Sequence, residues 1–130
     1  AQLEMTCAAV TLTEMEGACL KRVLEDVAGN LFHPDPYYQQ GGEMVRCGGL
    51  EYSISPLAQA GSRISELRLG GKPIDANKNY KVAGWASVQQ VDGEPIWDVV
   101  ARWLRSQGRV QDVRPNQPEV FGLQNNQGIV

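Results

Sequence analysis

The chain has 130 residues, of which 42% are apolar and 21% are charged, proportions typical of one ordinary globular domain. Its formal net charge of −3 argues against nucleic acid as the main partner. No stretch is apolar over the length of a membrane span. The first residues show neither an initiator methionine nor a targeting pattern, so we expect residues 1–130 to be a single domain of a larger protein.

The first part of the chain predicts a strand followed by a helix. Residues 10–15 alternate apolar and polar side chains with β-branched residues, as a strand does. From Ala18 the period becomes helical, with an apolar stripe at Leu20, Val23, Leu24, Val27 and Ala28. Four charged side chains are expected to face water: Lys21, Arg22, Glu25 and Asp26. Gly29 and Asn30 are expected to end the helix.

A long segment from Asn30 to Leu50 follows, with the only histidine, His33, and several glycines. Two X-Pro steps, at Pro34 and Pro36, disfavour helix in the residues before them. A loop of this length with aromatic and amide side chains is often functional. The alternative is a well-packed Ω-like loop whose tyrosine rings are buried.

The remaining chain predicts an α+β fold, with a mixed sheet of about four or five strands and two main helices. Strands are expected at residues 43–47, 50–54, 63–69 and 80–86, with a hairpin turn at 70–72. A second helix is expected from Pro95 to Gly108, with the apolar face Ile96, Val99, Val100, Trp103 and Leu104. Residues 109–130 show little periodicity and are expected to form an extended tail.

The cysteines and the histidine do not predict a metal site within the chain. Cys7, Cys19 and Cys47 lack Cys-x-x-C spacing and a nearby histidine. Their odd number leaves at least one thiol unpaired, so we expect buried free cysteines, with one disulfide as the second interpretation. His33 has no second histidine with which to form a multi-histidine site or a catalytic triad.

Charged residues give one candidate for ligand binding. Arg46 falls within the predicted strand 43–47, where an unpaired charge would be costly, so it should meet an internal carboxylate or the anion of a ligand. No spacing singles out a catalytic pair among the carboxylates, and each is expected to be a solvated surface group: Asp35, Glu43, Asp92 and Glu94.

Several segments together resemble SoxB, the family of sulfur-oxidation thiosulfohydrolases. They are Glu-Met-Glu-Gly at 14–17, Leu-Glu-Asp-Val in the following helix, the long motif from Asn30 to Arg46, Tyr-Lys-Val-Ala-Gly-Trp-Ala at 80–86, Gly-Glu-Pro-Ile-Trp-Asp at 93–98 and Asn-Asn-Gln-Gly-Ile at 125–129. The resemblance covers nearly the whole chain after Val10. It implies the 5′-nucleotidase superfamily, with residues 1–130 as the C-terminal substrate-binding domain.

The resemblance also implies the chemistry of the complete protein. A missing N-terminal metallophosphoesterase domain would hold two divalent metal ions, expected to be manganese, and this chain alone would contain no cofactor and no catalytic residue. The activity would be the release of sulfate from a cysteine S-thiosulfonate on the carrier protein SoxYZ, in periplasmic thiosulfate oxidation. Residues expected to bind that substrate are Arg46, Tyr37, Tyr38, Gln39, Gln40, Gly41 and Gly42.

Two departures separate the chain from a true nucleotidase. Nucleotidases hold the base between two aromatic rings. In this chain Cys47 takes the place of the first ring. The motif that carries the second ring reads Val-Asp-Gly-Glu-Pro at 91–95 and contains no aromatic residue. Each missing ring removes roughly 1–3 kcal/mol of stacking. A nucleotide phosphohydrolase of the same superfamily is therefore the second hypothesis. A purely structural or carrier-docking module is the third.

Overall fold

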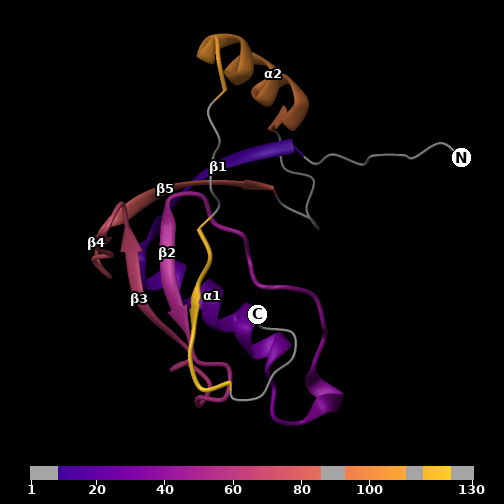
Figure 1. The fold of residues 1–130 in the computed structure, drawn as a ribbon, viewed down its shortest axis with the longest axis vertical. Coiled ribbons are helices and arrows are strands. Elements are labelled where there is room, and N and C mark those ends of the chain that lie inside the picture. The colour runs from indigo at the N-terminus through magenta and orange to yellow at the C-terminus, as the bar shows by residue number, and fades with distance from the viewer. Residues whose placement is uncertain (1–8, 86–92, 111–115, 124–130) are drawn as a thin grey trace, which may run out of the picture. The chain divides into compact units, whose positions relative to one another are not determined.

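The computed structural model describes residues 9–85, 93–110 and 116–123, and the chain divides into two compact units (Figure 1). The first unit comprises Ala1–Met15 and Asn79–Val113; the second comprises Glu16–Lys78 and Arg114–Val130. Cys7, Asp92, Ala86, the motif 125–129 and most of the predicted tail lie outside the described residues. The α+β class with two helices is confirmed, and the strands belong to two sheets.

The first unit contains a three-stranded sheet in the order β5-β1-β6 and the helix α2. The predicted strands at 10–15 and 80–86 are confirmed as β1 (Ala9–Glu16) and β5 (Asn79–Trp85). The short β6 (Glu94–Pro95) pairs antiparallel with β1, with Val10 opposite Glu94. Thr11 and Thr13 of β1 donate side-chain hydrogen bonds to the Gly84 and Val82 carbonyls, at 3.2 and 3.5 Å.

The predicted second helix is confirmed as α2 (Ile96–Gln107), which ends at Gly108 with φ 65°. Glycine adopts this left-handed conformation without the Cβ clash of other residues. The Arg102 guanidinium donates two hydrogen bonds to the Glu94 carboxylate, and these bonds lower the pKa of Glu94. Among described residues, none of α2 is buried, so its apolar face contributes little to a core.

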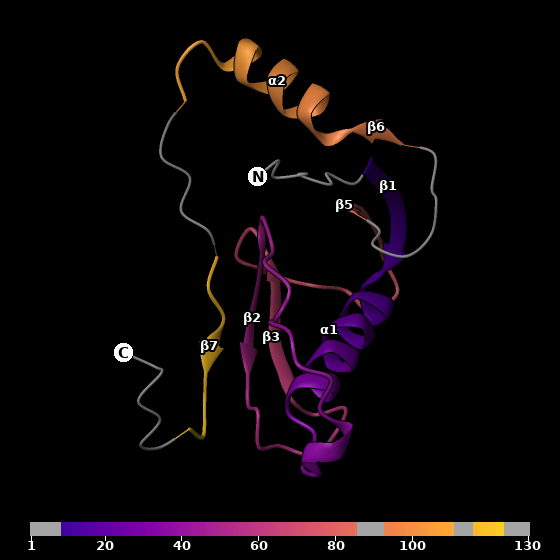
Figure 2. The ribbon, with the colours of Figure 1, turned by 90° about the vertical axis from the view of Figure 1, so that its right-hand side faces the viewer.

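The second unit packs α1 (Gly17–Leu31) against a four-stranded sheet in the order β4-β3-β2-β7 (Figure 2). Its strands are β2 (Leu50–Ile54), β3 (Ile64–Leu69), β4 (Lys72–Pro73) and β7 (Glu119–Val120). β3 pairs antiparallel with β2 and β4, whereas β7 pairs parallel with β2. The predicted strands at 50–54 and 63–69 and the hairpin turn at 70–72 are thereby confirmed.

The core of the second unit lies between α1 and the sheet. Leu24 and Ala28 of α1 meet Tyr52 and Ile54 of β2 and Ile64 of β3. These side chains are at most 6% exposed. Burying each large one stabilises the fold by about 1.5–3 kcal/mol. The second unit therefore has a hydrophobic core of its own.

A bulge in β3 changes the alternation that the sequence indicates. Glu51 and Ser53 of β2 are opposite Arg68 and Ser65 of β3, so β3 has one more residue than β2 in this interval. Glu66 in the bulge has φ 52°, a left-handed conformation that is uncommon for a residue with a Cβ. This bulge interrupts the strict two-residue period of burial along β3.

Three local predictions about the second unit are wrong. Residues 43–47 form no strand and belong to an irregular segment from Gln39 to Gly49. The helix continues through Gly29 and Asn30 to Leu31, and its last turn is closed by a hydrogen bond from the Phe32 N–H to the Ala28 carbonyl at 2.9 Å. Glu25, expected to face water, is buried at 9% exposure. Its carboxylate is satisfied by backbone N–H groups, which removes the cost of burying it.

No helix among the described residues combines the length and the apolar character needed to cross a membrane.

Candidate functional site

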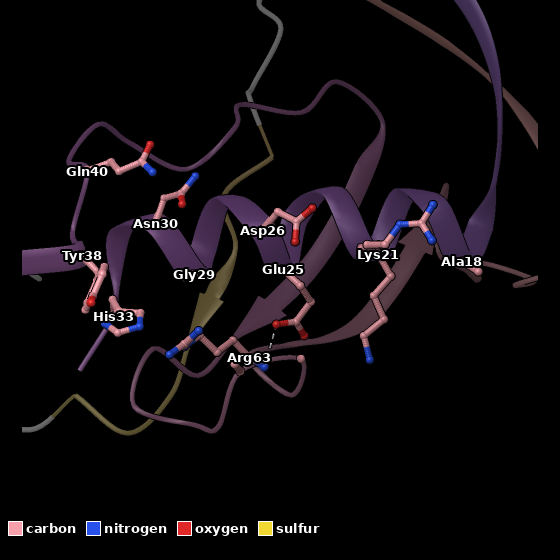
Figure 3. A pocket seen from close by; sticks show the side chains of 13 residues that line it. Ala18, Lys21, Glu25, Asp26, Gly29, Asn30, His33, Tyr38, Gln40 and Arg63 are labelled. Atoms are coloured by element: carbon pink, nitrogen blue, oxygen red, sulfur yellow. Dashed lines mark hydrogen bonds between the residues drawn. The ribbon is translucent and has the colours of Figure 1, made fainter. Parts of the chain in front are cut away.

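An open cavity of about 750 Å³ lies on the second unit, between α1, the segment after α1, and the turn that leads into β3 (Figure 3). We call it the α1 cavity. Its lining includes Lys21, Gly29 and Asn30 from the helix, His33, Tyr38 and Gln40 from the following segment, and Gly61 and Arg63 from the turn. It brings charged, aromatic and amide side chains to one place.

Local hydrogen bonds fold the segment after α1 back along the helix. A short 3₁₀ helix, η1 (Pro36–Tyr38), begins at Asp35, whose side chain accepts a 2.9 Å hydrogen bond from the Tyr37 N–H. Asparagine and aspartate favour such caps because a short side chain reaches the free N–H groups. The Gln40 N–H then donates to the Asn30 carbonyl at 2.9 Å. This bond places Gln40 beside the last turn of α1.

His33 and Tyr38 stand next to each other at one end of the α1 cavity. Their ring centroids are 5.1 Å apart with an interplanar angle of 59°. The His33 Nδ1 atom lies 3.1 Å from both the backbone nitrogen and the carbonyl oxygen of Asp35, so the local backbone occupies it. The Nε2 atom is the ring nitrogen that remains for a ligand.

The structure places only two of the predicted substrate-binding residues, Tyr38 and Gln40, in the α1 cavity. Tyr37 is 87% exposed and meets Tyr38 edge-on, at a centroid distance of 5.4 Å. The Gln39 amide donates to the His33 carbonyl at 2.7 Å, so it supports the segment itself. The expectation that the tyrosine rings are buried in a packed loop is wrong.

Gly41 and Gly42 follow with φ of 74° and 103°, conformations that side chains with a Cβ rarely adopt. A Cβ on Gly41 would meet no atom within 4 Å. These glycines are therefore required by the path of the backbone, and the space beside Gly41 is open.

Arg46 lies in an irregular segment, and its side chain is 84% exposed. The prediction of a buried arginine in a strand is thus wrong. Its guanidinium forms a 2.9 Å ion pair with Glu43, which is also exposed. Such a surface pair contributes about 0–1 kcal/mol to stability. Arg46 therefore has an internal carboxylate partner, and breaking that contact costs little.

Cys47 is half-buried against the core of the second unit. Burial raises the pKa of its thiol, because the thiolate would lose its hydration there. Cys19 is also half-buried and free, as Cys47 is. The prediction that the cysteines are free is confirmed for these two, but they are half-buried and not fully buried as expected.

Sequence patterns missed Arg63, Glu25 and Gly29 as parts of this site. Arg63 is 4% exposed, and Glu25 accepts hydrogen bonds from the backbone N–H groups of Arg63 and Ile64, at 3.2 and 2.8 Å. The only signal in the sequence for Arg63 was its charge at the start of a predicted strand. A charged side chain at such a position normally faces water. Gly29, expected to end the helix, instead leaves room above Arg63.

The described residues contain no group of three or more His, Cys, Asp and Glu side chains that could hold a metal ion. Glu51, Glu66 and Glu119 line a separate hollow of about 540 Å³, together with Arg68. The hydrogen bond from Arg68 to Glu66 raises the pKa of Arg68, and the other two glutamates raise it further. Arg68 thus partly neutralises the carboxylates of this hollow.

Comparison with known families decides the classification of the chain. Residues 5–102 match the family model described as 5′-nucleotidase, C-terminal domain. The chain belongs to this family. A search of curated proteins found no match.

Two solved structures are similar to this chain. The sulfate thiohydrolase SoxB of Thermus thermophilus, solved in complex with glycerol, is 39% identical with a TM-score of 0.75, over 93% of this chain and 24% of that protein. A Staphylococcus aureus protein described as a 5′-nucleotidase, solved with alpha-ketoglutarate, is 16% identical with a TM-score of 0.59, over 87% of this chain and 27% of that protein. The second similarity shows the fold alone. The chain spans about a quarter of each neighbour.

Proposed function

We propose that this chain is the C-terminal, substrate-recognising domain of a two-domain hydrolase of the SoxB type. The observation that carries the proposal is the 39% identity to SoxB of Thermus thermophilus over 93% of the chain. Catalysis would belong to an N-terminal metallophosphoesterase domain with two divalent metal ions, expected to be manganese, which activate water for hydrolysis. The chain described here would select and hold the substrate.

The substrate we propose is a cysteine S-thiosulfonate on the carrier SoxYZ, from which the enzyme releases sulfate during thiosulfate oxidation in the periplasm. The resemblance to SoxB implies that the SoxY arm that bears the cysteine is rich in glycine. The Gln40 amide and the side-chain oxygen of Gln39 can pair with its peptide groups, and the open space beside Gly41 lets its backbone approach closely. Tyr37 and Tyr38 would shape the entrance.

Arg46 is the residue that we assign to the terminal sulfonate. A guanidinium presents a planar fork of donors and stays charged at any working pH. Because Arg46 is exposed and its pair with Glu43 is weak, it can exchange that carboxylate for a ligand oxyanion at low cost.

The second candidate function is nucleotide phosphohydrolysis, which the family name favours. Two features of the sequence weigh against it. Cys47 and Glu94 occupy places where nucleotidases have aromatic rings, so neither residue can stack on a base. The third candidate, a carrier-docking module without any contact to the reacting group, predicts that no residue of the segment 37–46 affects catalysis.

Titration calorimetry of the complete protein separates these candidates. We expect a Gly-rich cysteine S-sulfonate peptide to bind and AMP to bind more weakly or not at all. Tighter binding of AMP would overturn the SoxB proposal in favour of a nucleotidase. If neither ligand binds, the result would favour docking of the carrier through another surface.

Kinetics of the Arg46→Ala variant test the role of the guanidinium. Loss of a charge-stabilising donor should cost about 2–4 kcal/mol in kcat/KM for the carrier substrate. Arg105→Ala, in the last turn of α2, is the matched control and should leave kcat/KM unchanged. If Arg46→Ala also leaves kcat/KM unchanged, Arg46 serves only in its pair with Glu43.

The isolated 130-residue chain is expected to hydrolyse nothing, because the proposed metal-activated water belongs to the other domain. Sulfate release by the purified chain above a metal-free blank would contradict the assignment of catalysis to the N-terminal domain.

A further inference from the structure

Arg63 is a buried arginine whose guanidinium is only partly used. Its Nε donates to the Pro56 carbonyl and its Nη2 to the Phe32 carbonyl, each at 3.1 Å. The structure gives Nη1 no acceptor among residues 9–85, 93–110 and 116–123, and no carboxylate in these ranges forms an ion pair with the guanidinium. Two carbonyls thus fix the plane of a cation that is 4% exposed, and its Nη1 donors remain free.

The free side of the guanidinium belongs to the α1 cavity. A Cβ added to Gly29 would lie 4.0 Å from Nη1, and both Gly29 and Arg63 line the cavity. Figure 3 shows the Arg63 side chain extending away from Glu25 and toward His33 and Tyr38. His33 and Tyr38, which line the same cavity, carry further groups that can donate hydrogen bonds to a ligand there.

The carboxylates of the cavity do not compete for this position. Both oxygens of Glu25 already accept backbone hydrogen bonds, from Arg63 and from Ile64. Asp26 also lines the cavity, but among the described residues it forms no ion pair with Arg63. Lys21 and Arg22, which also line the cavity, add positive charge to it.

We propose that the α1 cavity is a binding site for an oxyanion, with Arg63 Nη1 as its principal donor. The ligand class is a sulfate, phosphate or carboxylate group, because a fixed guanidinium presents paired N–H donors to oxygen atoms of such groups. A volume of about 750 Å³ also admits a larger molecule that carries the oxyanion. The site does not use Arg46, but it shares Tyr38 and Gln40 with the segment that we propose to contact the carrier.

The test uses the complete protein and titration calorimetry at constant ionic strength maintained with chloride. Sodium sulfate, sodium phosphate and sodium acetate are the probes, and saturable 1:1 binding of at least one is expected. In Gly29→Leu, whose side chain fills the space over Nη1, binding should weaken at least about tenfold, a difference that calorimetry resolves. Val23→Leu adds bulk to an exposed α1 position outside the cavity and should bind as the unmodified protein does.

Binding at Arg63 can also be followed by NMR in protein that retains this arginine, so the readout does not require a stable Arg63 variant. In the ¹⁵N–¹H spectrum of arginine Nε groups, the Arg63 signal should shift on addition of the probe and should be absent in Arg63→Lys. Arg46→Ala should retain both the binding and the shift, which separates this site from the proposed sulfonate contact. The proposal is overturned if no probe shifts the Arg63 signal, or if Gly29→Leu and Val23→Leu bind the probes equally well.

Discussion

The Glu25 carboxylate of α1 accepts hydrogen bonds from the backbone N–H groups of Arg63 and of the next residue, at 3.2 and 2.8 Å. It thereby supplies acceptors to two backbone N–H groups at the start of β3. The same contact fixes the backbone from which the Arg63 side chain enters the α1 cavity. A helix side chain therefore couples the fold of the second unit to the geometry of its cavity.

Removing this carboxylate should destabilise the fold strongly. Glu25→Ala leaves two buried N–H donors without acceptors, and we expect the free energy of unfolding to fall by about 2–4 kcal/mol. Asp26→Ala, at an exposed neighbouring position of α1, should change it by no more than about 0.5 kcal/mol. Urea unfolding of both variants measures the difference. Equal effects would mean that water replaces the carboxylate.

Replacing each of two glycines of α1 by alanine should change the stability of the protein in opposite directions. A Cβ on Gly17 would lie 2.2 Å from the Asp75 carbonyl oxygen and 2.6 Å from Ile74 Cγ2, so Gly17→Ala should destabilise the protein by about 1–3 kcal/mol or more. A Cβ on Gly29 meets nothing closer than 4.0 Å, so Gly29→Ala should stabilise it by about 0.5–1 kcal/mol. Thermal unfolding of the two variants tests the contrast. A stable Gly17→Ala protein would contradict the close approach of the Ile74–Asp75 backbone.

Periodicity predicted the elements whose apolar residues face one side. It located β1, β5 and both helices, because a pattern of burial with period two or 3.6 is local in the sequence. It failed at Glu25, since a buried carboxylate depends on backbone N–H groups 38 and 39 residues away. It also failed for the burial pattern of β3, where the bulge at Glu66 interrupts the alternation.

The candidate site was predictable only in part. The aromatic and amide composition of the segment after α1 indicated Tyr38 and Gln40, which do line the cavity. Arg46 was favoured because it was assigned to a strand, and that strand does not form. Arg63 became a candidate only when the fold placed its guanidinium between α1 and the turn before β3, a proximity that no spacing in the sequence contains.

Cys47 should react slowly with thiol reagents in the folded protein. Burial raises the pKa of its thiol, and each unit of increase lowers the thiolate fraction about tenfold at neutral pH. The measurement uses a variant with Cys7→Ser and Cys19→Ser, in which the rate of maleimide alkylation is followed as a function of pH. The pH at which this rate reaches half its maximum should be higher in buffer than in urea. A midpoint in buffer equal to or below that in urea would contradict the desolvation of Cys47.

Tyr52 carries a buried hydroxyl group that should affect the stability of the protein. Tyr52 is 6% exposed, and its hydroxyl has no hydrogen-bond partner among the described residues. Tyr52→Phe removes a buried unsatisfied group, so we expect the free energy of unfolding at pH 7 to rise by about 1 kcal/mol. Tyr37→Phe, at an exposed position, is the matched control and should change nothing.

Burial, and secondarily the charge of Cys47, raises the pKa of Tyr52 above its ordinary value near 10. The folded state therefore holds the phenol proton more tightly than the unfolded state does. The resulting stabilisation is fully present below about pH 10 and is lost as the pH rises through the folded-state pKa. Urea unfolding at pH 7 and pH 10.5 should show a smaller alkaline loss of stability for Tyr52→Phe than for the unmodified protein. A destabilised Tyr52→Phe at pH 7 would mean that the hydroxyl has a stabilising partner in solution. Equal alkaline losses would mean that folding does not raise the pKa of Tyr52.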